Sequence, residues 1–171
     1  MARRDDSPRG NPGAVALGIL WLLGGALLAG SGLLRLVPTL YALGAIALVA
    51  GAIGLVVAFL PNTTVSFWAE LVPSGLLVAL GAVLVRFPTL EPRALAVAAS
   101  VVFLGSGTVR LGAAREFVAA WRPFLVAGLV SVFLGLVLLS DVLEPTTTGV
   151  AFLLGCDLIV GGAVLMQTSR R

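Results

Sequence analysis

Six long apolar stretches separated by short polar ones dominate the pattern of the chain. A helix of about 20 apolar residues is long enough to cross roughly 30 Å of hydrocarbon. The pattern therefore predicts an all-α polytopic membrane protein with six transmembrane helices. The predicted helices cover about residues 14–34, 40–60, 65–85, 94–112, 124–139 and 149–166.

A Pro-Thr corner recurs three times along the chain, at Pro38-Thr39, Pro88-Thr89 and Pro145-Thr146. Each corner is followed by an apolar segment with a Gly-small pair, so we interpret the chain as three repeated helical hairpins. Since all three hairpins would share one orientation, we expect approximate threefold pseudo-symmetry about the membrane normal. The predicted parts are a disordered cytoplasmic tail at 1–12, hairpins at 13–61, 62–117 and 118–167, and a cytoplasmic C-terminal end at 168–171.

Small residues at intervals of four line the second and fifth predicted helices. In lipid, helices associate through close backbone contact across small residues, because lipid tails are as apolar as the side chains. A phosphate-binding loop would need a strand before it and a lysine after it, and neither is present. The residues predicted to pack helices together are Ala47, Gly51, Gly54, Gly105, Ala127, Ser131, Gly135, Gly155 and Gly162.

Composition agrees with a membrane location. The chain is 59% hydrophobic and 11% charged, whereas a soluble domain carries about 25% charged residues. The arginines sit at segment ends rather than on one basic face, which argues against a nucleic-acid partner. The first apolar run is too long for the core of a signal peptide, so we expect it to remain as an uncleaved helix.

Arginine placement predicts the orientation in the membrane. Eight arginines fall on the side of the two termini and three on the other, so both termini should be cytoplasmic. The eight are Arg3, Arg4, Arg9, Arg110, Arg115, Arg122, Arg170 and Arg171, and the three are Arg35, Arg86 and Arg93.

Three charged residues inside apolar stretches are the candidate sites for a proton, an ion or a polar lock. Asp157 falls near the bilayer middle, where a carboxylate costs roughly 2.5–3.5 kcal/mol, so it should find a partner such as Ser131 or Thr108. Glu70 near a helix start suits an interfacial carboxylate, and Arg110 could extend to the headgroups.

Enzyme chemistry is not expected from this sequence. There is no histidine, the single cysteine excludes an internal disulfide, and no nucleophile with a base or metal-ligand cluster is visible. We therefore predict no catalytic, cofactor-binding or metal-binding residues.

The third hairpin, whose second helix reads FLLGCDLIVGGAVLM, resembles the HdeD-type acid-resistance membrane proteins. The first hairpin is similar to that family through GSGLLRLVPTL and LGAIALVAGAIG, as is the linker AREFVAAWRPF. Members often carry an acidic residue just before the final glycine of a hairpin; Gly161 holds that position here, and Asp157 lies four residues earlier. The resemblance implies a multi-pass protein of a prokaryotic plasma (inner) membrane linked to acid stress.

Two functions of different classes follow as expectations. The first is a non-enzymatic membrane protein linked to acid or general stress resistance, with the lipid bilayer and a second copy or another membrane protein as partners. The alternative is a small transporter or channel for protons or small solutes that uses Asp157.

Overall fold

The apolar stretches form helices throughout the part of the chain that can be described. The computed structural model describes residues 12–33, 40–59, 67–116, 121–140 and 146–169. Residues 1–11 of the predicted N-terminal tail and the Pro38-Thr39 corner lie outside these residues, whereas Pro12, the last residue of the predicted tail, begins the first helix. The helices are α1 (Pro12–Leu33), α2 (Leu40–Ala58), α3 (Phe67–Arg86), α4 (Pro92–Glu116), α5 (Trp121–Leu139) and α6 (Thr147–Ser169).

The largest difference from the predicted boundaries is at the end of α4. The predicted helix ends at about residue 112, but α4 continues through residues 113–116 and ends at Glu116. Ala113 and Ala114 lie in this stretch and are buried. Alanine is the best helix former and both side chains gain a packing surface, so the charged residues beyond them remain on a helix.

Local chemistry fixes two helix boundaries. In the turn between α3 and α4, the amide of Leu90 donates to the carbonyl of Phe87 at 3.2 Å, with Pro88 at the second position of the turn. Thr146 caps α6, because its hydroxyl accepts a hydrogen bond from the amide of Gly149 at 3.0 Å. The corners at Pro88 and Thr146 therefore work as a turn and a helix cap.

Four of the described helices are long and apolar enough to cross a membrane: Phe67–Arg86, Pro92–Glu116, Trp121–Leu139 and Thr147–Val164. In α1 and α2 the corresponding apolar stretches are shorter, Gly18–Gly30 and Leu40–Val56. Large apolar side chains also face outward, among them Leu27 and Phe133, which are 68% and 65% exposed. Because water would penalise such a surface, the chain has the character of a membrane protein.

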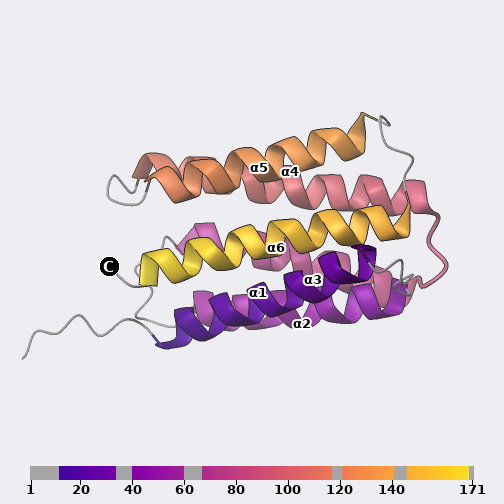
Figure 1. The fold of residues 1–171 in the computed structure, drawn as a ribbon, viewed down its shortest axis with the longest axis horizontal. Coiled ribbons are helices and arrows are strands. Elements are labelled where there is room, and N and C mark those ends of the chain that lie inside the picture. The colour runs from indigo at the N-terminus through magenta and orange to yellow at the C-terminus, as the bar shows by residue number, and fades with distance from the viewer. Residues whose placement is uncertain (1–11, 34–39, 60–66, 117–120, 141–145, 170–171) are drawn as a thin grey trace, which may run out of the picture.

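The helices lie side by side in a bundle, with the start of α1 and the end of α6 at the same end (Figure 1). Each helix packs against the next one in sequence, and α6 returns against α1, so the bundle is closed. The most extensive contacts join α1 with α6, α2 with α3, and α4 with α5. The closest packing therefore joins helices of different predicted hairpins, including the first with the third. The two helices of one predicted hairpin contact each other less extensively.

Glycines bring α1 and α6 into backbone contact. A Cβ atom on Gly25 would lie 2.6 Å from the carbonyl oxygen of Gly155, and a Cβ on Gly155 would lie 2.6 Å from that of Gly25. Two turns away, a Cβ on Gly162 would lie 2.7 Å from the carbonyl oxygen of Gly18. No side chain fits at these distances, so glycine at these positions sets how closely the two helices approach.

The α2–α3 and α4–α5 pairs are built in the same way. A Cβ on Gly81 would lie 2.8 Å from the carbonyl oxygen of Gly44, and one on Gly51 would lie 2.8 Å from that of Ser74. Between α4 and α5, a Cβ on Gly107 would lie 2.9 Å from the carbonyl oxygen of Gly128. Each of the three closest helix pairs thus depends on residues without a side chain at the point of contact.

Candidate functional site

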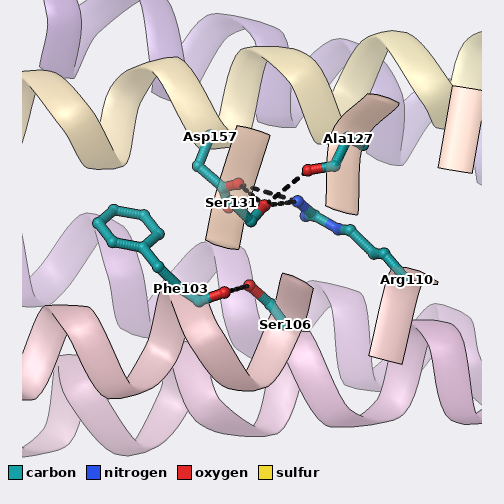
Figure 2. A network of polar contacts seen from close by, with 6 residues as sticks. All are labelled: Phe103, Ser106, Arg110, Ala127, Ser131 and Asp157. Atoms are coloured by element: carbon teal, nitrogen blue, oxygen red, sulfur yellow. Dashed lines mark hydrogen bonds and ion pairs between the residues drawn. The ribbon is translucent and has the colours of Figure 1, made fainter. Parts of the chain in front are cut away.

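The interior of the bundle contains a buried ion pair that joins three helices. Nη1 of Arg110 on α4 donates to Oδ1 of Asp157 on α6 at 2.9 Å and to Oγ of Ser131 on α5 at 2.7 Å. The Ser131 hydroxyl has two acceptors within reach, the Asp157 carboxylate and the carbonyl of Ala127, the latter at 3.0 Å. Figure 2 shows the three polar side chains converging between the helices.

All three polar side chains are enclosed by protein. Arg110 and Asp157 are 6% and 7% exposed, and Ser131 is fully buried. Removing one partner from such a pair costs about 3–5 kcal/mol, because the remaining charge stays buried without compensation. The network therefore holds α4, α5 and α6 in one arrangement.

Close helix approach allows this network to form. The contact between Gly107 and Gly128 brings α5 near enough to α4 for the short side chain of Ser131 to reach Arg110. On α4, Arg110 follows Phe103 and Ser106 at the spacing of one helix face, and all three are buried. The Ser106 hydroxyl bonds to the carbonyl of Phe103 in its own helix, outside the ion-pair network (Figure 2).

Gly161 and Trp21 form the other side of the guanidinium site. A Cβ on Gly161 would lie 2.9 Å from Nη2 of Arg110 and 2.9 Å from the ring of Trp21. Trp21 is buried, and its Nε1 lies 3.4 Å from the carbonyl oxygen of Ala50 on α2, a long and weak hydrogen bond. The glycine therefore leaves the space that the arginine occupies beside the indole.

A small cavity lies next to the ion pair. Its volume is about 30 Å³, which is enough to hold at least one water molecule. Residues from five helices line it: Trp21, Ala69, Glu70, Pro73, Arg110, Phe124, Gly161 and Val164.

Glu70 is the unusual member of this lining. Its side chain lies in the first turn of α3 and the residue is 5% exposed. Among the described residues, neither of its carboxylate oxygens has a hydrogen-bond partner. One turn further along α3, the buried hydroxyl of Ser74 is also without a partner within the described ranges. An unpaired buried carboxylate is costly, so its presence calls for an explanation.

Pro73 adds a further irregularity to the wall of this cavity. It lies inside α3, which continues unbroken from Phe67 to Arg86. Proline has no N–H group, so it cannot donate the helical hydrogen bond to the carbonyl of Ala69, which also lines the cavity.

The structure changes the expectations for the three candidate residues. Asp157 does contact Ser131, whereas Thr108 bonds instead to the carbonyl of Gly105 in its own helix. The expectation that Arg110 extends to the headgroups is wrong, because its side chain is buried and paired with Asp157. Glu70 is near a helix start, as expected, but it is enclosed by the bundle.

The residues proposed to pack helices lie mostly in the interior. Gly105 is half-buried against Leu76, and Ser131 belongs to the ion-pair network. The others are buried: Ala47, Gly51, Gly54, Ala127, Gly135, Gly155 and Gly162.

Sequence reasoning missed several residues that the structure brings into the site or the closest contacts. Trp21 carries no local signal, because its role depends on helices distant in the sequence. Gly161 was noted only through the family resemblance, and its place beside Arg110 and Trp21 depends on the same long-range packing. Most of the glycines at the contacts did carry a signal: on four helices two of them lie seven residues apart, two helical turns, whereas intervals of four were sought. The missed contact glycines are Gly18, Gly25, Gly44, Gly81, Gly107 and Gly128.

Within the described residues, no group of three or more histidine, cysteine, aspartate or glutamate side chains could hold a metal ion. Comparison with protein-family models, with curated proteins and with solved structures gave no match to this chain.

Proposed function

We propose that this chain is a non-enzymatic integral membrane protein of a prokaryotic plasma membrane, linked to acid or general stress resistance as its resemblance to the HdeD family implies. In this proposal six helices cross the bilayer and both termini are cytoplasmic. Its partners are the lipid bilayer and a second copy or another membrane protein.

The spacing of the contact residues supports three repeated hairpins. The first contact position is Gly18 on α1, Ser74 on α3 and Gly128 on α5. The interval is 56 residues from α1 to α3 and 54 residues from α3 to α5. A similar contact at similar intervals is what three copies of one unit would produce. The contact positions that are seven residues apart are Gly18 and Gly25, Gly44 and Gly51, Ser74 and Gly81, Gly128 and Gly135, and Gly155 and Gly162.

The hydrogen bonds and burial of Asp157 favour a structural role over a role in transport. Its carboxylate is engaged by both Arg110 and Ser131 and is closed off from solvent. A carboxylate that carries protons or ions across the membrane must release its partners in each cycle, at a cost of several kcal/mol for a buried pair. Asp157 is better suited to holding the bundle together.

Survival under acid tests the stress proposal. We expect an acid-sensitive bacterium that produces the full chain to survive an acid challenge better than the same strain with an empty vector. Gly75→Ala is the control for a harmless substitution and should protect as well as the wild type, because no atom of the described residues lies within 4 Å of a Cβ at this position. Equal survival of the producing strain and the empty-vector strain, at matched growth before the challenge, would contradict the proposal.

The second candidate function, a small transporter or channel for protons or small solutes, is favoured by the cavity beside Arg110. The cavity has room for at least one water molecule and is lined by residues of five helices.

Proton flux separates the two candidates. Proteoliposomes with an acidic exterior are compared for the wild type, Asp157→Asn and empty vesicles. Under the structural proposal we expect the wild type to leak no faster than empty vesicles. Flux in the wild type that Asp157→Asn abolishes would support the transporter and overturn the structural assignment of Asp157.

A further inference from the structure

We infer that Glu70, together with the cavity beside Arg110, forms a proton-binding site inside the bundle. The inference deepens the second candidate function, since it places the proton on Glu70 instead of Asp157. Its test measures proton binding at equilibrium, so it can fail or succeed whether or not the protein transports anything.

When Glu70 is ionised, its negative charge has no counter-charge among the described groups around the cavity. Arg110 on α4 and Asp157 on α6 neutralise each other in a direct ion pair. The residues of α1 and α5 that line the cavity, Trp21 and Phe124, are uncharged, and α2 contributes no charged residue between Leu40 and Ala58. An ionised Glu70 therefore gives the described cluster a net charge of −1 in an apolar interior.

A single proton removes this charge. An isolated ionised carboxylate away from water costs several kcal/mol, and a group in that position is neutralised instead. The reaction is the transfer of a proton from hydronium to a Glu70 carboxylate oxygen, which leaves a neutral carboxylic acid and one water molecule. The new O–H group can donate a hydrogen bond, and a cavity of about 30 Å³ has room for one water to accept it.

The lining favours a proton over a metal cation. Hard cations such as Ca²⁺ and Mg²⁺ take six or more oxygen ligands. Glu70 is the one side chain with carboxylate oxygens among the residues that line the cavity, and the neighbouring Arg110 would repel a cation. A proton needs a single oxygen, which Glu70 supplies.

The position of Glu70 indicates from which side the proton arrives. It lies in the first turn of α3, near one end of the bundle, and Arg110 lies in the last third of the antiparallel α4. The cavity is thus nearer the end where α3 begins. The proposed topology places that end on the cytoplasmic side, so the site would exchange protons with the cytoplasm.

Infrared difference spectroscopy on the full chain in lipid nanodiscs tests this inference. The spectra record the carbonyl band of a protonated carboxyl group as the buffer is acidified from alkaline to mildly acidic. We expect a band from an apolar environment in the wild type, its loss in Glu70→Gln, and its retention in Glu91→Gln, which removes an exposed carboxylate. Proton uptake, measured with a pH dye in weak buffer, should fall by about one proton per chain in Glu70→Gln.

Three results would overturn the inference. One is an unchanged band and unchanged uptake in Glu70→Gln. Another is loss of the band in Asp157→Asn with its retention in Glu70→Gln, which would move the proton to Asp157. The third is displacement of the proton when sodium replaces choline in the buffer, which would make this a metal-cation site.

A second variant keeps the test decisive if Glu70→Gln folds poorly. Glu70→Asp retains a carboxyl group and should keep a band at a shifted frequency. A band that is identical in Glu70→Asp and the wild type would show that the signal comes from another residue.

Discussion

At the residue scale, the pairing of Arg110 with Asp157 accounts for two charges that the sequence places in different apolar segments. Each alone is costly inside a bilayer, and together with Ser131 they satisfy each other. Sequence spacing gave Asp157 a central depth and proposed Ser131 as a partner. It could not identify Arg110 as the third member, because 47 residues separate it from Asp157 and only helix packing brings them together.

Single and double substitutions of the pair test this account. We expect Asp157→Asn to lower the free energy of unfolding by about 3–5 kcal/mol, because it leaves the Arg110 guanidinium buried without a counter-charge. The double variant Arg110→Met with Asp157→Leu should recover most of this loss, since it removes both buried charges. The measurement is equilibrium unfolding in mixed detergent micelles.

Ser140→Ala is the control for these variants, because within the described residues its exposed hydroxyl bonds to the carbonyl of Val137 in its own helix. A double variant that is no more stable than Asp157→Asn would show that the loss does not come from the guanidinium left without a counter-charge. Equal stability of the wild type and Asp157→Asn would exclude a structural role for the pair.

At the element scale, the contact glycines determine which helices lie against each other. Gly81 and Gly75 are both on α3 and differ in what surrounds them. A Cβ at 81 would lie 2.5 Å from the backbone nitrogen of Leu48 on α2, whereas one at 75 would meet nothing within 4 Å. Comparing the effect of alanine on stability at the two positions therefore distinguishes the contribution of helix contact from that of helix propensity.

We expect Gly81→Ala to destabilise the protein by about 1–3 kcal/mol, because α2 and α3 must move apart to admit a methyl group. Gly75→Ala should be neutral or stabilise by up to about 1 kcal/mol, because alanine favours the helix and meets no neighbour. Thermal unfolding of both variants in the same detergent checks the difference. If both substitutions change stability equally, the α2–α3 contact does not depend on glycine at 81.

At the scale of the whole molecule, the two ends of α4 report how the bundle is oriented in the membrane. Thr89 lies in the turn between α3 and α4, and Arg115 lies near the other end of α4; both are exposed. With Cys156 replaced by serine, single cysteines at 89 and 115 can be labelled in intact cells by a thiol reagent that does not cross membranes.

We expect Thr89→Cys to be labelled from outside and Arg115→Cys only after the cells are opened, because arginine-rich ends stay in the cytoplasm. The reverse pattern would place both termini outside. Labelling of both positions from one side would show that α4 does not span the membrane.

What the sequence determined by itself is the helical class, the approximate helix bounds and the membrane character, because these follow from local runs of apolar residues and their length. The small-residue positions were also visible, although the interval of seven that the contacts use was missed. The tertiary structure decided which helices pair most closely, the meeting of Arg110 with Asp157, and the enclosure of Glu70 beside them. These features depend on contacts between residues distant in the chain, and a periodic apolar pattern does not specify which helix face meets which neighbour.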